Sequence, residues 1–249
     1  MTRAGGEAEG PGTGVGLFTT THWSVVLAAG QQGSPQATEA LEKLCGTYWR
    51  PLYVYVRRRG YGPEDAQDLT QQFFAVFLEN ECFSLADPDR GKFRTFLLKS
   101  IQHFLTDEWR RVHRAKRGGG AVSIPWDTRA AEDGCAAELT EAMTPERAYE
   151  RRWAMTLLEQ VLDSLRAEYA QAGKARLFEA LQDFLWGPDA SISYARIAEE
   201  LDMTEGAIRV AVHRLREHYR ERLRAEVGHT VGNPGDVDEE LRYLIALMS

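Results

Sequence analysis

Basic and polar side chains that could bind a nucleic acid gather in two stretches of the sequence. Between residues 92 and 117, eight lysines and arginines stand against two acids, Asp107 and Glu108. Between residues 204 and 216, arginines and a histidine recur with helical spacing opposite an apolar stripe. Basic groups bind phosphates, while amide, aromatic and small polar groups contact bases. Both stretches therefore indicate contact with DNA.

The second stretch has the pattern of a helix-turn-helix. Ser193 can cap a short helix, residues 202–204 form a turn, and Thr204 can cap a second helix. The apolar stripe of the second helix consists of Ile208, Ala211, Val212, Leu215 and Tyr219. The residues expected to face DNA are Thr204, Glu205, Gly206, Arg209, Val210, His213, Arg214 and Arg216. This pattern is typical of DNA-binding proteins, although two amphipathic helices with a solvated charged face would have the same periodicity.

The first stretch is expected to form one long helix over residues 92–116. Its core face is assigned to Phe93, Phe96, Leu97, Ile101, Phe104 and Val112. Its candidates for binding an unpaired strand are Lys99, Gln102, His103, Thr106, Asp107, Arg110, Arg111 and Arg114. Basic, amide and imidazole groups suit phosphates and unstacked bases. The alternative is a solvated basic helix.

A third helix pattern, residues 64–79, carries acids and amides in place of basic groups. Its expected core face is Ala66, Leu69, Phe73, Val76 and Phe77. Its candidate protein-binding residues are Asp65, Asp68, Leu69, Gln71, Gln72, Phe74 and Leu78. Phe74 and Leu78 are expected beside the polar face, where exposed apolar residues often mark interfaces; a solvated face is the alternative. Thr70 could carry a phosphate beside Asp68, although we favour an ordinary helix residue there.

The composition limits the class of protein. A hydrophobic fraction of 43% is ordinary for a globular chain, and no run of about eighteen apolar residues is present. Three cysteines without a CxxC spacing fit reduced thiols, so we expect a cytoplasmic protein with no membrane segment, disulfide or metal site. The net charge of −7 argues against a protein that coats nucleic acid unaided. This balance suits a subunit that a larger complex brings to DNA.

The order of helix and break signals predicts an all-α fold with two small helical domains joined by a flexible acidic linker. No alternating strand pattern appears, and glycine and proline clusters divide the chain. The expected units are a disordered tail over 1–20, a helical domain over 21–117, a linker over 118–144, a helix-turn-helix domain over 145–228 and a tail helix over 229–249. The tail helix is short and needs a partner surface; it is expected to pack on the C-terminal domain, with regulation as the alternative.

Three motifs in this order resemble the sigma-70 family of RNA polymerase sigma factors. DAQDLTQQFF is similar to the family's DAEDLxQExF helix, which binds the clamp coiled coil of RNA polymerase. KFRTFLLKSIQHFLTDEWRRVHR resembles FxxWLxxIxxNxxxDxxRRxxR, which recognises and opens the minus-ten element. SYARIAEELDMTEGAIRVAVHRLR resembles SYxEIAExLGxSxGTVxxxxxRAR of the domain that reads the minus-thirty-five element. The match covers about residues 38–117 and 145–224, the layout of the compact extracytoplasmic-function (ECF) group.

The resemblance implies the partners and the roles of the three residue sets. Core RNA polymerase would bind through its clamp and flap, promoter DNA would bind both basic helices, and residues 118–143 would thread toward the active-site cleft. An anti-sigma factor or a kinase could regulate the chain. The sequence departs from the family pattern at His103, where asparagine is usual, at Asp202, where glycine is frequent, and in the extra residues 229–249.

Two other classes of function, a stand-alone DNA-binding regulator and an enzyme, fit the sequence less well. A stand-alone helix-turn-helix regulator would explain the basic helices, but it leaves DAQDLTQQFF unexplained, and such regulators usually dimerise. An enzyme is disfavoured because the sequence holds no P-loop, GxGxxG, GxSxG or HExxH motif. We therefore expect no catalytic residue, no cofactor and no small-molecule substrate.

Overall fold

The computed structural model describes Val26 and residues 35–80, 82–114, 135, 138–139, 142–186 and 193–248. Every regular element in these ranges is helical, so the all-α prediction is confirmed. None of the described helices combines the length and apolarity needed to cross a membrane. The expected tail over 1–20 lies outside the described residues.

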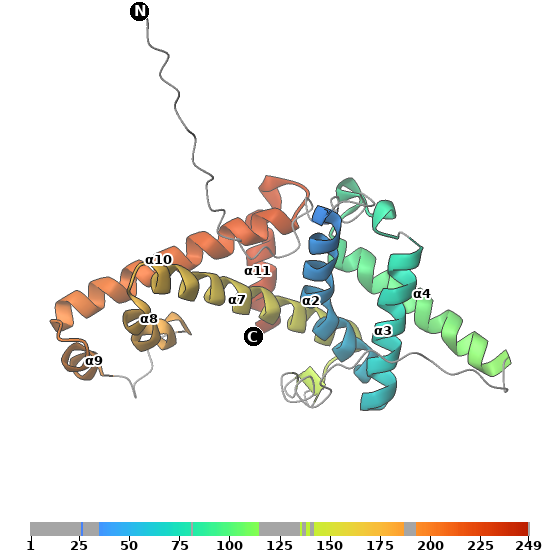
Figure 1. The fold of residues 1–249 in the computed structure, drawn as a ribbon, viewed down its shortest axis with the longest axis horizontal. Helices are drawn as coiled ribbons and strands as arrows, with labels where there is room; N and C mark the ends of the chain where they lie inside the picture. Colours follow the sequence, from blue (N-terminus) through green and yellow to red (C-terminus); the bar gives the residue numbers. More distant parts are fainter. Residues whose placement is uncertain are drawn as a thin grey trace, which may run out of the picture.

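The helices follow the predicted order along the chain (Figure 1). Their bounds are α2 Pro35–Arg58, α3 Pro63–Glu79, α4 Phe93–Arg114, α7 Pro145–Gln171, α8 Ala175–Leu181, α9 Tyr194–Glu200, α10 Glu205–Thr230 and α11 Val237–Met248. The 3-10 turns are η1 Cys82–Leu85, η2 Pro88–Arg90, η3 Gln182–Trp186 and η4 Pro234–Asp236. Helix α2 continues through Pro51.

Local signals in the sequence explain where the main helices begin. Thr144 caps α7 by accepting a hydrogen bond from the backbone N–H of Arg147 at 3.2 Å, and Pro145 occupies the first turn. Thr204 caps α10 in the same way, accepting from the N–H of Ala207 at 3.2 Å. Ser193 precedes α9 as predicted but makes no side-chain cap bond. These caps fix the starts of the two longest helices.

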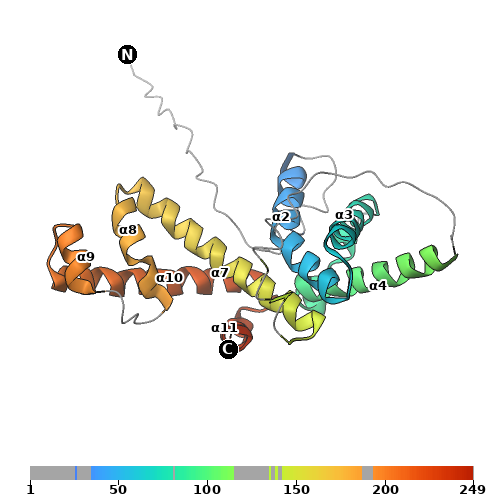
Figure 2. The same ribbon diagram turned by 90° about the horizontal axis from the view of Figure 1, so that it is seen from below.

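The buried apolar residues form two main cores, and helices α7 and α10 belong to both. The larger core joins α2, α3 and α4 to Tyr149, Trp153 and Leu157 of α7, to the end of α10 and to α11. The smaller core joins the second half of α7 to α8, η3, α9 and the first half of α10. Figures 1 and 2 show both long helices running from the end that carries α9 toward α2, α3 and α4.

This packing does not confirm the predicted division into two domains. Trp153 is 1% exposed and Tyr149 is fully buried, yet both belong to the part of the chain assigned to the C-terminal domain. Helix α7 packs along α2 more extensively than along any other element. Interfaces that are large and apolar hold domains in one arrangement. The sequence pattern could not predict the contact between α7 and α2, because an apolar stripe on one helix does not indicate which other helix packs against it.

Part of the predicted linker is also packed against helices α2 and α7. Cys135 is fully buried with Val54 and Ala148, and Glu138 is 3% exposed. The Oε1 atom of Glu138 lies 3.8 Å from Nη1 of Arg152, which is itself 3% exposed. In addition, Arg58 donates hydrogen bonds to the carbonyl oxygens of residues 139 and 143. The described residues of the linker therefore lie against α2 and α7, and its other residues are outside the described ranges.

Candidate nucleic-acid and protein interfaces

The predicted helix-turn-helix is formed by α9 and α10. Ile197 and Ala198 of α9 and Ile208 and Val212 of α10 are buried between the two helices. The turn depends on Asp202, whose φ of 53° is left-handed, a conformation that aspartate adopts more readily than most residues. The residues between α9 and α10 thus fold as the sequence predicted, and they set the start of α10 at the surface.

Seven of the eight residues predicted to face DNA from this motif are exposed. They are Thr204, Glu205, Gly206, Arg209, Val210, His213 and Arg214. Arg209 pairs with Glu205 at 3.7 Å, and its guanidinium lies 4.7 Å from the ring centroid of Tyr194. Val210 is 50% exposed and adds an apolar group to this otherwise polar surface.

Arg216 was expected to face DNA, and the structure corrects this. Its Nε and Nη2 atoms donate to the carbonyl oxygen of Phe184 at 2.9 and 2.7 Å, and the side chain is half-buried. Arg216 follows the core residue Leu215, so it lies at the edge of the buried stripe and reaches η3. Its guanidinium therefore joins α10 to η3 and is not directed at an external partner.

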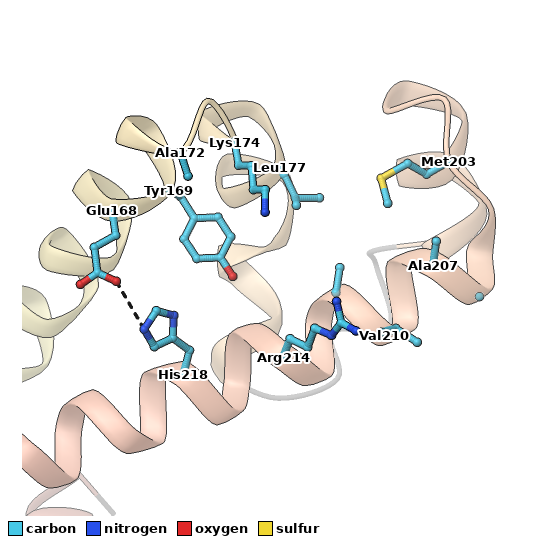
Figure 3. A pocket seen from close by; sticks show the side chains of 12 residues that line it. Glu168, Tyr169, Ala172, Lys174, Leu177, Met203, Ala207, Val210, Arg214 and His218 are labelled. Carbon is cyan, nitrogen blue, oxygen red and sulfur yellow. Dashed lines mark ion pairs between the residues drawn. The ribbon is translucent and has the colours of Figure 1, made fainter.

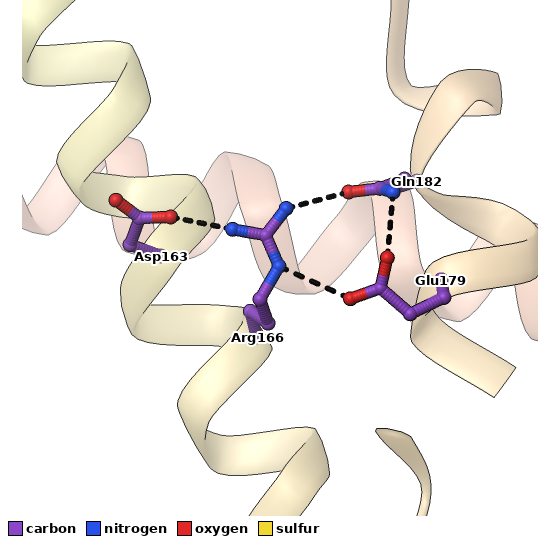
Figure 4. A network of polar contacts seen from close by, with 4 residues as sticks. All are labelled: Asp163, Arg166, Glu179 and Gln182. Atoms are coloured by element: carbon purple, nitrogen blue, oxygen red, sulfur yellow. Dashed lines mark hydrogen bonds and ion pairs between the residues drawn. The ribbon is translucent and has the colours of Figure 1, made fainter. Parts of the chain in front are cut away.

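A network of polar side chains holds α8 and η3 against α7 (Figure 4). Arg166 of α7 pairs with Asp163 at 2.6 Å and with Glu179 at 3.2 Å, and it donates to Gln182 at 2.9 Å. Gln182 in turn donates to Glu179 at 3.0 Å. The network lies at the surface of α7, α8 and η3, and both α8 and η3 also pack against α10 of the helix-turn-helix.

A groove beside the start of α10 was missed at the sequence level. It has a volume of about 650 Å³ and is lined by apolar atoms of Tyr169, Leu177, Met203, Val210 and Ala211, among others (Figure 3). One end is closed by His218, whose Nε2 atom lies 3.3 Å from the carboxylate of Glu168. The apolar side chains of Met203 and Val210, both exposed, were the only sign of this groove in the sequence. A single exposed apolar residue is common on protein surfaces and does not by itself predict a groove.

The outward face of α4 carries most of the residues assigned to the minus-ten element. Lys99, His103, Thr106, Asp107, Arg110 and Arg111 are exposed, and Gln102 is half-buried. Arg110 pairs with Asp107 at 3.3 Å, and Arg111 pairs with Glu108 at 2.7 Å. Lys99, His103, Arg110 and Arg111 are thus at the surface, where phosphates can reach them. Arg114 ends α4, and its side chain lies outside the described part of the structure.

Trp109 is a surface residue of α4 that the sequence pattern did not single out. It is 57% exposed, next to Arg110 in the chain and on the side of the helix that carries Gln102 and Thr106. On the opposite face of α4, the predicted core residues Phe93, Leu97 and Ile101 are buried, and Leu98 and Leu105 are buried with them. Phe96 and Phe104, also predicted in the core, are half-buried. Because an exposed tryptophan beside basic groups offers a stacking surface for bases, Trp109 joins the candidate residues.

Helix α3 presents the acids and amides as predicted but buries a different apolar face. Asp65, Asp68 and Leu78 are exposed, and Leu69, Gln71 and Gln72 are half-buried. Phe74, expected at the surface, is 7% exposed and lies against Phe73, with ring centroids 5.7 Å apart. Val76, expected in the core, is 41% exposed. The periodicity identified a helix but not its rotation, because two polar residues, Gln67 and Thr70, lie on the buried face.

The hypothesis of a phosphate switch at Thr70 is wrong for this conformation. Thr70 is fully buried, and its hydroxyl donates to the carbonyl oxygen of Ala66 at 2.7 Å. A modifying enzyme could not reach this hydroxyl without unfolding α3. The hydrogen bond is the usual way in which a helical threonine satisfies its side chain.

The described residues contain no group of three or more His, Cys, Asp or Glu side chains that could hold a metal ion. The chain has no significant match among protein-family models, curated proteins or solved structures.

Proposed function

We propose that the chain is an ECF-like sigma factor that binds core RNA polymerase and directs promoter-specific initiation of transcription. The observation that carries the proposal is the presence, on one chain, of three surface helices with three different chemistries. An acidic and amide face lies on α3, a basic face with an exposed tryptophan lies on α4, and a helix-turn-helix ends in α10. Each corresponds to one motif of the family that the sequence resembles.

The helix-turn-helix supports duplex recognition at the minus-thirty-five element. The start of α10 is exposed, and Arg209, His213 and Arg214 stand on its outer side. Arginine can bind guanine through two hydrogen bonds in the major groove, while Val210 can contact a thymine methyl. The positive end of the α10 dipole attracts the phosphate backbone, and the carboxylate of Glu205 in the first turn partly offsets this attraction.

Helix α4 supports capture of the unpaired minus-ten strand. Lys99, Arg110 and Arg111 supply phosphate contacts, and Trp109 supplies a stacking surface. Opening a duplex requires that the separated bases find new partners, since unstacking costs a few kcal/mol per step. A helix with phosphate-binding and stacking groups on adjoining sides provides contacts for the backbone and for the unstacked bases of the separated strand.

Two surfaces support polymerase binding. Asp65 and Asp68 form an exposed acidic pair on α3, flanked by the half-buried Gln71 and Gln72. We place the clamp contact there, with Leu78 and Val76 as exposed apolar neighbours. The groove between α7, α8 and α10 is an apolar surface at the other end of the molecule, and we place the flap contact there.

The proposal is tested by transcription in vitro with a library of promoter sequences and purified bacterial core polymerase. Addition of the chain should enrich templates that share two short elements, and removal of the chain should abolish this selection. Transcripts that do not depend on the chain, together with direct affinity of the chain for a duplex site, would favour the stand-alone regulator.

A further inference from the structure

A buried cluster of charges joins the C-terminal helix to the start of α4. Glu240 of α11 is 1% exposed, and its Oε1 atom lies 2.6 Å from Nη1 of Arg94, which is 3% exposed. Its other oxygen contacts Nζ of Lys92, a residue 148 positions away in the chain. Burial alone would raise the pKa of Glu240, but attraction to Arg94 and Lys92 outweighs burial and lowers it. Glu240 is therefore ionised at neutral pH.

Helix α7 takes part in the same cluster through Arg94. The guanidinium of Arg94 lies 4.1 Å from the ring centroid of Trp153, and the hydroxyl of Tyr149 donates to the carbonyl oxygen of Arg94 at 2.9 Å. The ring of Tyr243 of α11 has its centroid 5.7 Å from the guanidinium of Arg94 and 5.5 Å from Nζ of Lys92. One arginine is thus held by α4, α7 and α11 together.

Apolar contacts extend this connection to α10. Val237, Leu244 and Leu247 of α11 are buried in the larger core with Val227 of α10. The first turns of α10 belong to the helix-turn-helix, which is assigned to the minus-thirty-five element. Because α11 contacts both α10 and α4, it connects this motif to the helix assigned to the minus-ten element. We call this set, Val237–Met248 with the ion pairs of Glu240, the α11 clasp.

The packing of the predicted linker conflicts with what polymerase binding would require. If the chain is a sigma factor, residues 118–143 enter the active-site cleft of polymerase. In the structure Cys135 and Glu138, which belong to that segment, are buried against Val54 and Arg152. Movement of Cys135 and Glu138 into the cleft would break these contacts with α2 and α7, and the α11 clasp holds α7 and α10 against α4.

We propose that the α11 clasp is an autoinhibitory device: it holds the chain closed, and core polymerase binds a form in which Glu240 has left Arg94 and Lys92. The inference rests on the proposed sigma function and adds its regulation. Release of the clasp raises the fraction of binding-competent chain, and the apparent Kd falls by the same factor. The three outer faces stay accessible in the closed form, so the clasp acts through the arrangement of the domains and not by covering a face.

The test compares the affinity of the full chain for purified bacterial core polymerase among three proteins. Glu240→Gln removes the charge while keeping the size of the side chain. Glu239→Gln is the matched control: the same helix loses one charge, but Glu239 is exposed, whereas Glu240 is buried. We expect Glu240→Gln to lower the Kd by about tenfold or more and Glu239→Gln to leave it unchanged.

A second design avoids any defect in folding. A protease recognition sequence is inserted into the exposed turn at residues 232–235, between α10 and α11, and the folded protein is cut after purification. Cutting should lower the Kd for core polymerase in the same direction as Glu240→Gln. Equal affinity of wild-type, Glu240→Gln and cut proteins would overturn autoinhibition while the sigma function stands. Failure of all three to bind polymerase would overturn the sigma function itself.

Discussion

The carboxylate of Glu240 lies 2.6 Å from the guanidinium of Arg94, and both side chains are almost completely buried. The pair joins the last helix of the chain to the helix assigned to promoter opening, across the larger core. A buried pair of this kind fixes an arrangement, because neither charge tolerates the loss of the other.

Removal of one partner of this pair should destabilise the protein strongly. Arg94→Met leaves the buried Glu240 with Lys92 as its remaining cationic partner, and the loss of one partner of a buried pair costs up to about 3–5 kcal/mol. The double variant Arg94→Met/Glu240→Leu should recover most of that loss, because both charges are gone. Urea unfolding monitored by circular dichroism measures each free energy. Equal losses in the single and double variants would show that the site needs the arginine for packing and not for charge.

The same pair predicts a pH dependence. The pKa of Glu240 is lowered in the folded state, so its stabilisation is present above the unfolded pKa of about 4.3 and is lost as pH falls through the folded value. The nearby Glu150 acts in the opposite sense: burial raises its pKa, opposed by Arg94, so its ionisation costs stability as pH rises. The other groups that face the pair are Lys92, Tyr149 and Tyr243.

The measurement is the difference in unfolding free energy between wild type and Glu240→Gln as a function of pH. That difference should be large at pH 7 and shrink toward zero below about pH 4. A difference that stays constant over this range would mean that the charge of Glu240 contributes nothing to stability.

Trp109 should contribute to binding of single-stranded DNA. Trp109→Ala removes a stacking surface, and such changes cost about 1–3 kcal/mol per stacked base. Trp186→Ala is a suitable control, since Trp186 is 60% exposed but lies beside Tyr219 at the other end of the molecule. Fluorescence anisotropy of a labelled minus-ten strand, with the chain bound to core polymerase, measures the effect. Identical affinities for the two variants would exclude Trp109 from the strand-binding surface.

Arg209 and Arg216 should separate into a DNA-binding and a structural role, although both are arginines of α10. Arg209→Ala should weaken binding to the minus-thirty-five duplex by about 1–3 kcal/mol without a loss of stability. Arg216→Ala should lower the free energy of unfolding by about 1.5–3 kcal/mol, because the carbonyl of Phe184 loses a charged donor. Duplex binding and thermal unfolding, measured for both variants, distinguish the roles. The reverse assignment would contradict the orientation of Arg216.

The sequence predicted the helices better than their partners. The cap at Thr204 and the turn over residues 202–204 are local features, and the structure confirms both. The rotation of α3 was wrong because Gln67 and Thr70 are buried while Val76 is exposed, which no periodicity of apolar residues indicates.

Long-range contacts could not be predicted from the pattern of one chain. From the sequence, Glu240 would be predicted to be an exposed acid on a short helix. In the structure it is buried and forms ion pairs with Arg94 and Lys92, which are distant in sequence. Arg216 reads as part of a basic face because the position of the Phe184 carbonyl depends on how η3 packs. The surfaces assigned to polymerase and DNA rest on exposure and on the resemblance, and they remain predictions.

The most direct test of the sigma-factor proposal is stoichiometric binding of the full chain to bacterial core RNA polymerase. The proteins to compare are wild type, Asp65→Ala/Asp68→Ala on the proposed clamp surface, and Glu39→Ala/Glu42→Ala as a control. The control removes two exposed acids from a different helix, α2. We predict that wild type and control form a one-to-one complex and that the Asp65→Ala/Asp68→Ala protein, with unchanged circular dichroism, does not. Absence of a complex for wild type and for the protein cut between α10 and α11, together with direct affinity for duplex DNA, would contradict the account.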